Sequence, residues 1–202
     1  SVASPAELRL LETAGRLPGV DLVVIPPGPA LARVRDLVIA GNSAQMANPA
    51  FVAELKAWLR FNPVSAAAHR DGLFSACSGN PSAPSWLGPA LFDLTFKADA
   101  ENDRYAAQLD SSAGVAVFLG ERDDPAHWVQ AGRSCQRFAL QATALGIKTA
   151  FVNQPVEEAG LRPELAALAG LPGRRPDIVM RFGRGPALPM SLRRAVDAVI
   201  VA

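Results

Sequence analysis

Residues that could bind an anion gather near the end of the chain. They follow an apolar run that ends at Phe182, in a segment rich in glycine and proline, and they are Arg184, Ser191, Arg193 and Arg194. Guanidinium and hydroxyl groups bind phosphate through charge-assisted hydrogen bonds, which an arginine can donate as a fork. The segment therefore indicates either an anion-binding loop or, as is common for paired arginines, a solvated corner of the surface.

The other residue types able to do chemistry form no catalytic pattern. Cys77 and Cys135 lack the spacing of a redox or zinc site, and His69 and His127 are too isolated for a metal site. The sequence contains no nucleophile elbow, Walker loop or complete GxGxxG motif. We therefore expect no metal and no catalytic side chain, and hydrolase or nucleotidase functions lack support.

Composition narrows the class of protein. Half of the 202 residues are apolar, so the chain can bury a sizeable core, and we expect a single domain over residues 1–202. The net charge of +1 lacks the basic excess typical of a nucleic-acid surface. No apolar run is long enough to span a membrane and no export signal is visible, so we expect a cytoplasmic protein without membrane or nucleic-acid partners.

Local patterns predict helices and strands in mixed order in the first half of the chain. Ser4 and Glu7 form a capping box, with Pro5 at the first helical position. A short apolar run and then two segments with helical spacing of their apolar residues follow it along the chain. We predict helices over 5–16, 31–47 and 51–60 and a strand over 21–25.

Residues 61–103 form a long stretch rich in Pro, Gly, Ser and Asn that still contains large apolar side chains. So long a segment without clear periodicity is either a lid or an extension that wraps around a partner. We favour the wrapping segment, because its apolar side chains must pack on something.

The second half predicts a buried sheet with one central helix. We predict strands over 114–119, 149–152 and up to 182, a loop over 153–158, a short helix over 163–169 and a last strand over 195–202. A long helix begins after Asp124 and ends before Gly146. Its apolar stripe steps by three and four residues: Trp128, Ala131, Cys135, Phe138, Ala142 and Leu145. This mixture indicates an α+β layer fold.

The second half resembles the nitroreductase superfamily of flavoproteins. It is most similar to the carboxy-terminal lobe of the two-lobed Acg-type bacterial proteins. The matching residues follow the family order from about position 54, and they are 111–114, 123–128, 132–133, 136–137, 142–146, 153–157, 181–183 and 191–194.

The resemblance implies an α+β nitroreductase-like fold with a mixed or antiparallel sheet flanked by helices, and FMN bound between two like lobes. It places the flavin ring near Asn153, Gln154, Pro155 and Val156, and the phosphate near the terminal arginines, with Ser191 as a further donor. The expected partners are NAD(P)H, a planar small-molecule acceptor and a second subunit in a homodimer. FMN has a dianionic phosphate at one end and a planar ring at the other, which matches a phosphate site at the arginines and a separate ring site.

One departure from the family concerns the amino end. Members of the superfamily usually open with a helix that bears an Arg-Arg-Ser-type phosphate motif, and Ser1 corresponds to a position after that helix. We therefore expect either a piece of a two-lobed protein or a shortened form with an incomplete phosphate site.

Two functions from different classes fit the sequence. The first is an FMN-dependent NAD(P)H oxidoreductase that reduces nitroaromatic or quinone-like acceptors; hydride chemistry belongs to the cofactor, which explains the missing catalytic dyad. The second is a flavin-binding or flavin-sequestering module, or a non-catalytic lobe, in which residues 61–103 close over the ring. The two functions can be distinguished by whether NADPH reduces the bound flavin.

Overall fold

The computed structural model describes residues 3–200, which form two compact units. The larger unit contains the described residues up to Gln45 together with Ala98–Gly185. The smaller unit contains Met46–Lys97 and the described residues from Pro186 onward. Among the described residues, no helix is both long and apolar enough to cross a membrane.

A four-stranded antiparallel sheet organises the larger unit. Its strand order is β1-β4-β6-β5, and the strands are β1 (Val20–Ile25), β4 (Gly114–Gly120), β5 (Lys148–Phe151) and β6 (Arg175–Gly183). Every residue of β4 is buried, as its run of small and branched apolar residues predicts. Because side chains alternate along a strand, β4 supplies core residues to both faces of the sheet.

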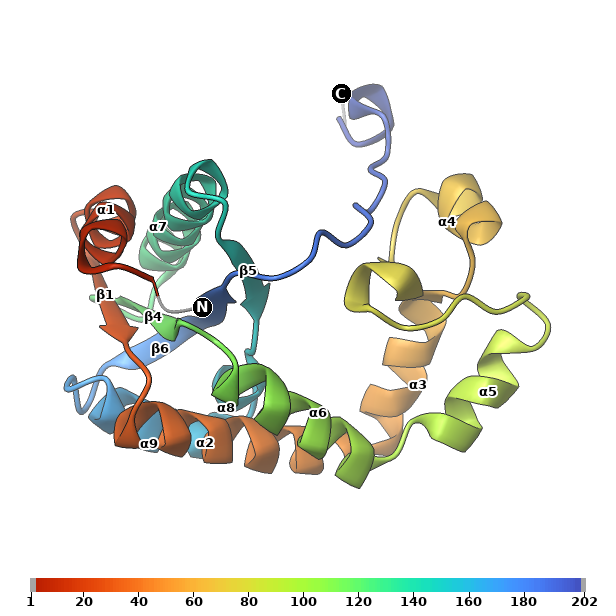
Figure 1. The fold of residues 1–202 in the computed structure, drawn as a ribbon, viewed down its shortest axis with the longest axis horizontal. Coiled ribbons are helices and arrows are strands. Elements are labelled where there is room, and N and C mark those ends of the chain that lie inside the picture. Colours follow the sequence, from red (N-terminus) through yellow and green to blue (C-terminus); the bar gives the residue numbers. More distant parts are fainter. Residues whose placement is uncertain (1–2, 201–202) are drawn as a thin grey trace. The chain divides into compact units, whose positions relative to one another are not determined.

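Helices α1 (Pro5–Gly15) and α7 (Pro125–Ala144) cover one face of the sheet (Figure 1). Ser4 caps α1 with the predicted capping box, and Asp124 caps α7 by accepting a hydrogen bond from the backbone of His127. Phe138 of α7 is fully buried between Phe118 and Phe182, with ring centroids 5.7 and 5.6 Å away. These edge-to-face contacts fix α7 against the centre of the sheet.

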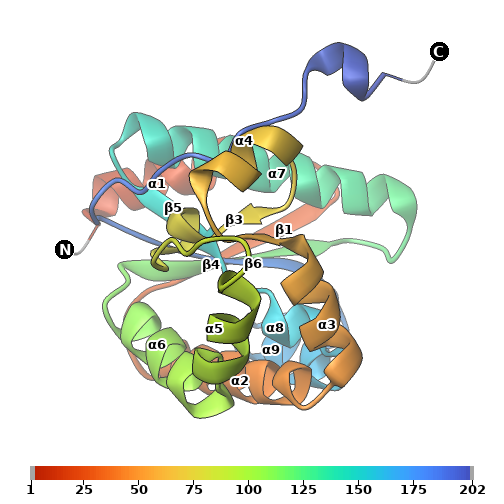
Figure 2. The ribbon, with the colours of Figure 1, turned by 90° about the vertical axis from the view of Figure 1, so that its right-hand side faces the viewer.

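Four helices cover the other face, as Figures 1 and 2 show. They are α2 (Pro29–Met46), α6 (Ala98–Asp110), the short α8 (Gln154–Glu157) and α9 (Arg162–Leu168). Their apolar residues join the odd-numbered residues of β4 in a second core, which includes Val34, Leu109 and Leu165. We call these helices the α2 layer. The larger unit is thus a three-layer α+β structure, and the predicted fold class is confirmed.

The smaller unit consists of short elements. They are α3 (Pro49–Trp58), β2 (Leu59–Arg60), α4 (Pro63–His69), β3 (Leu73–Phe74), a 3₁₀ turn (Ser75–Ser78), α5 (Gly88–Thr95) and a final 3₁₀ turn (Val196–Ala198). The stretch 61–103, predicted to lack regular structure, therefore contains helices. Two helices of the smaller unit, α3 and α4, begin at Asn-Pro pairs, in which Asn48 and Asn62 cap the first turn.

Three other predictions about structure were wrong. Residues 195–200 do not form a strand but include a 3₁₀ turn, because their backbone finds no ladder partner among the described residues; positions 201–202 lie outside these. Trp128 is 46% exposed rather than buried, because its indole N–H donates to Asp123 in the turn before α7. The predicted loop at 153–158 contains α8. The rest of the α7 stripe is buried or half-buried.

Phe138 is the side chain whose removal should destabilise the larger unit most clearly. We expect Phe138→Ala to lower the free energy of unfolding by about 3 to 5 kcal/mol, because it leaves a cavity between two aromatic rings. Chemical denaturation measures this loss. Leu140→Ala on the same helix, at a 64% exposed position, is the control and should change stability by about 0.5 kcal/mol or less. Equal losses in the two variants would contradict the packing described.

Candidate functional site

The turn that follows β5 is buried and held at both ends. The side-chain oxygen of Asn153 accepts a hydrogen bond of 2.9 Å from the backbone N–H of Val179, and Arg162 Nε donates to the carbonyl of Val156 at 2.6 Å. Between these two anchors, Gln154, Pro155 and Val156 are all buried. The four residues predicted to lie beside a flavin ring are therefore one rigid helical turn rather than a flexible loop.

Helix α8 packs closely on α2. A Cβ added to Gly41 would lie 2.8 Å from the backbone carbon of Gln154, so only glycine allows this approach. One turn further on, Gln45 Nε2 donates to Glu157 Oε2 at 2.6 Å. Gln45 is 5% exposed, so this hydrogen bond is largely shielded from water and fixes the position of α8.

Polar side chains beside α8 retain unused hydrogen-bonding atoms. Gln154 Oε1 and Arg181 Nε are buried without a hydrogen-bond partner among the described residues. Tyr105 of α6 lies near both: burial raises its phenol pKa, Glu101 raises it further, and Gln154 opposes the shift. Burial also lowers the pKa of the Arg181 guanidinium, and the positive charge of Arg104 adds to this effect. The α2 layer thus contains a polar site whose hydrogen bonds are incomplete.

Arg184, a predicted phosphate ligand, lies in the larger unit and already has a carboxylate partner. Its Nη2 donates to Glu7 Oε1 at 2.5 Å and lies 3.4 Å from the carbonyl oxygen of Leu145. The hydrogen bond from Arg184, followed by those from the backbone and hydroxyl of Ser4, lowers the pKa of Glu7 to about 2. In this arrangement Arg184 ties the chain after β6 to the start of α1.

Ser191, Arg193 and Arg194 belong to the smaller unit. Ser191 is half-buried, and its hydroxyl lies 3.5 Å from the sulfur of Cys77, whereas Arg193 and Arg194 are exposed. Arg193 contacts only nearby backbone carbonyls, those of Ser191 and Leu192, among the described residues. Both guanidinium groups are thus accessible to an anion. The structure brings these three residues together, and brings Asn153–Val156 together, within separate units.

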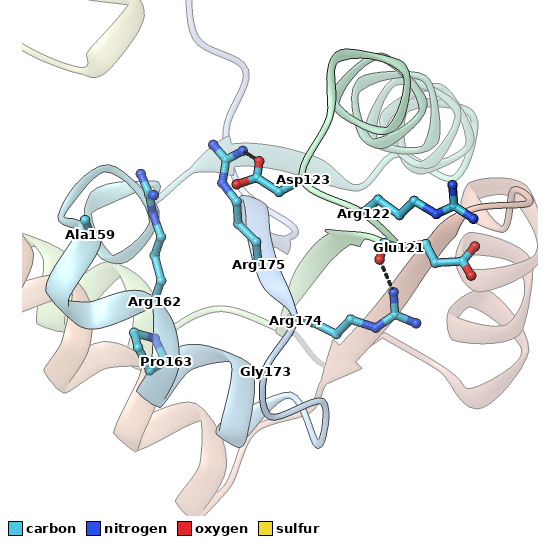
Figure 3. A pocket seen from close by; sticks show the side chains of 10 residues that line it. Glu121, Arg122, Asp123, Ala159, Arg162, Pro163, Gly173, Arg174 and Arg175 are labelled. Carbon is cyan, nitrogen blue, oxygen red and sulfur yellow. Dashed lines mark hydrogen bonds and ion pairs between the residues drawn. The ribbon is translucent and has the colours of Figure 1, made fainter.

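A hollow of about 440 Å³ opens at the end of the sheet where β4 finishes and β6 begins (Figure 3). It is lined by Gly120, Glu121, Arg122, Asp123, Ala159, Arg162, Pro163, Gly173, Arg174 and Arg175. Arg174 donates to the carbonyl of Glu121 at 2.5 Å, and Arg175 bonds to the carboxylate of Asp123.

The arginines of this hollow are mostly committed to the fold. Arg174 also lies 3.4 Å from Asp21, and Arg175 stacks over the Trp128 ring with 5.2 Å to its centroid. Arg162 uses Nε to hold the Val156 carbonyl. We conclude that these cations brace the turn before α7 and the segment from α8 to α9. In residues 3–200, no group of three or more His, Cys, Asp or Glu side chains could hold a metal.

Sequence reasoning missed several residues around α8. Tyr105, Gln45 and Arg162 come from distant parts of the chain, and nothing in their local pattern marks them. Arg181 had a usable signal, because it is a charged residue inside an otherwise apolar strand end, Ile178 to Phe182. A charge in a half-buried strand requires a partner or a ligand.

Comparison with known proteins rests on structure alone. No protein-family model matches the chain, and no curated protein matches it in sequence. Solved nitroreductases do match in structure across the whole chain.

Three of these illustrate the likeness. The FMN-dependent nitroreductase NfnB from Mycobacterium smegmatis, solved with NADPH, has 15% identity and a TM-score of 0.61, over 100% of this chain and 90% of that one. The FMN and NADPH-dependent NfnB from Sphigopyxis sp. strain HMH has 16% identity and a TM-score of 0.57, over 100% and 91%. A nitroreductase with bound FMN from Bacteroides fragilis has 12% identity and a TM-score of 0.56, over 100% and 90%. This chain has the nitroreductase fold.

The Glu7–Arg184 pair predicts a stability change at acid pH. Because the pKa of Glu7 falls from 4.5 to about 2 on folding, its contribution is fully present above about pH 4.5 and is lost as the pH falls toward 2. The difference in melting temperature between wild type and Glu7→Gln should therefore be largest near neutral pH and shrink over this window. Arg184→Gln should abolish most of the difference, and a pH-independent difference would contradict the assignment.

Proposed function

From this fold, we propose that the chain is an FMN-dependent NAD(P)H oxidoreductase of nitroreductase type that reduces nitroaromatic or quinone-like acceptors. The observation that supports it most directly is the likeness to FMN-containing nitroreductases across the whole chain, combined with a buried, braced turn at Asn153–Val156. A cytoplasmic location remains part of the proposal.

Each of the two units offers residues suited to one end of FMN. Arg193 and Arg194 offer accessible guanidinium groups to the phosphate, with Ser191 as a hydroxyl donor. The turn at Asn153–Val156 offers a fixed edge to the ring, and the unpartnered Gln154 Oε1 supports a hydrogen-bond donor of the ring at this edge. When bound, FMN supplies the hydride chemistry, which requires no acidic or basic side chain from the protein. The protein would hold, orient and shield the ring.

A partner subunit is also part of the proposal, as a homodimer or an amino-terminal lobe. Several large apolar side chains are exposed on the smaller unit, and contact with a partner is one reason for such exposure. They include Val64 (79%), Trp86 (80%), Leu94 (70%) and Met190 (90%). Burying such side chains against a second lobe is the simplest way to stabilise them.

Anaerobic titration with NADPH tests the activity. We expect the purified chain, reconstituted with FMN, to be yellow and to lose its visible flavin absorbance when NADPH is added, and to regain it with a quinone or nitroaromatic. A yellow protein that NADPH does not reduce, but that dithionite reduces, would contradict the enzyme and support flavin storage. A protein that retains no flavin after gel filtration would contradict both functions.

The two terminal arginines give a second prediction. Replacing Arg193 or Arg194 by Ala should weaken FMN binding by about 1.5 to 3 kcal/mol, the usual contribution of a hydrogen bond to a charged group. Lysine at either position should restore only part of this, because it lacks the planar fork. Isothermal titration calorimetry measures both effects.

Riboflavin is the matched control, because it lacks the phosphate and should bind wild type and variants almost equally. The melting temperature should change little, since both side chains are exposed. Equal losses of riboflavin and FMN affinity would show that the arginines act on the fold and that the phosphate lies elsewhere.

A further inference from the structure

Two buried polar atoms, one in α8 and one in strand β6, lack a hydrogen-bond partner among the described residues. Gln154 is 8% exposed and its Oε1 accepts nothing, while the buried Nε of Arg181 donates to nothing among residues 3–200. A buried polar atom without a partner costs roughly 1 to 3 kcal/mol, so proteins seldom retain one without a reason. Gln154 needs a donor, and Arg181 needs an acceptor.

Both residues lie on the same side of the sheet. Arg181 of β6 is paired with Val115 of β4 on one side and with Ala150 of β5 on the other. Val115 belongs to the core under the α2 layer. Directly paired residues project from the same face, so Arg181 also projects toward the α2 layer. Tyr105 of α6 interacts electrostatically with Arg181 and through a hydrogen bond with Gln154. Tyr105 thus connects the two unpaired groups.

Arg181 has no ion pair in the described part of the chain. The other cation beside it, Arg104, lies 3.8 Å from Glu101, and the charges of Glu101 and Glu157 act on Tyr105. The charged groups that shift the pKa of Arg181 are Arg104, which lowers it, and Tyr105, which raises it. An electron-rich carbonyl, or a negative charge spread over a ring, would relieve both the repulsion and the missing hydrogen bond.

We propose that Gln154 and Arg181 together bind the imide edge of the flavin ring, with Gln154 Oε1 accepting from the ring N3–H and Arg181 donating to the carbonyl at C2. This inference rests on the proposed function and adds its ring-recognition residues. The edge of an imide presents an acceptor, a donor and an acceptor in sequence. Gln154 and Arg181 lack a donor and an acceptor, respectively, and two neighbouring positions of that edge supply them.

A methyl group on N3 provides the test, because it removes the donor without changing the rest of the ring. We expect the wild-type chain to bind lumiflavin about tenfold more tightly than N3-methyl-lumiflavin, as measured by quenching of flavin fluorescence. Gln154→Leu should lose this preference and bind both ligands at the weaker level. Arg181→Met should weaken both about tenfold or more while keeping the preference for lumiflavin.

Gln45→Leu is the matched control, because Gln45 is an equally buried amide on the facing helix with its bond already made to Glu157. It should lower the melting temperature of the flavin-free chain and keep the preference for lumiflavin. Gln154→Leu removes the hydrogen bond to Tyr105 as well as the unpartnered oxygen, so the ligand preference rather than the melting temperature is the deciding measurement. A purely structural role for Gln154 would lower the stability of Gln154→Leu, as in Gln45→Leu, and leave the preference for lumiflavin intact.

The outcomes separate the inference from the function on which it rests. If the wild type binds neither lumiflavin nor FMN, the proposed function fails and the inference fails with it. If the wild type binds flavin but accepts N3-methyl-lumiflavin equally well, the inference alone is wrong. In a chain that retains flavin, the midpoint potential should also be lower in Arg181→Met, because a cation beside the ring favours its electron-rich reduced form.

Discussion

The structure depends on one strand that is buried on both faces. All seven residues of β4 are buried, and its two neighbours, β1 and β6, satisfy its backbone groups from either side. Its even-numbered residues, such as Phe118, pack under α1 and α7, while its odd-numbered residues, such as Val117, pack under the α2 layer. A shift of one position would exchange these two sets. This pairing therefore sets which side chains of β4 face α1 and α7 and which face the α2 layer.

Close packing is also what makes the candidate site rigid. Helix α8 can lie on α2 only because Gly41 has no side chain, and Asn153 and Arg162 then hold the turn to β6 and α9. A site so fixed loses little conformational entropy when a ligand binds, which favours affinity. Gln154, whose Oε1 has no partner among the described residues, lies within this braced turn.

Arginines serve at least two purposes in this chain, and their type alone does not distinguish them. Arg174, Arg175 and Arg184 bond to carboxylates or carbonyls and connect segments far apart in the sequence. Arg193 and Arg194 are exposed, and Arg181 is half-buried with an unsatisfied nitrogen. The second group lacks carboxylate partners of this kind, although Nε of Arg175 in the first group is also buried without a partner among the described residues. A carboxylate nearby in space, which sequence spacing does not show, makes the difference for Arg175 and Arg184.

The sequence by itself determined the elements whose signals are local. The capping box at Ser4, the unbroken apolar run of β4 and the stripe centred on Phe138 each indicated the correct element, because capping and periodicity involve residues within a few positions of one another. Only the tertiary structure decided which polar groups remained unpaired. Tyr105, Gln154 and Arg181 meet through strand pairing and helix packing, and the exposure of Trp128 follows from its bond to Asp123. Hydrogen bonds and charges depend on distances in space, and the fold alone sets these.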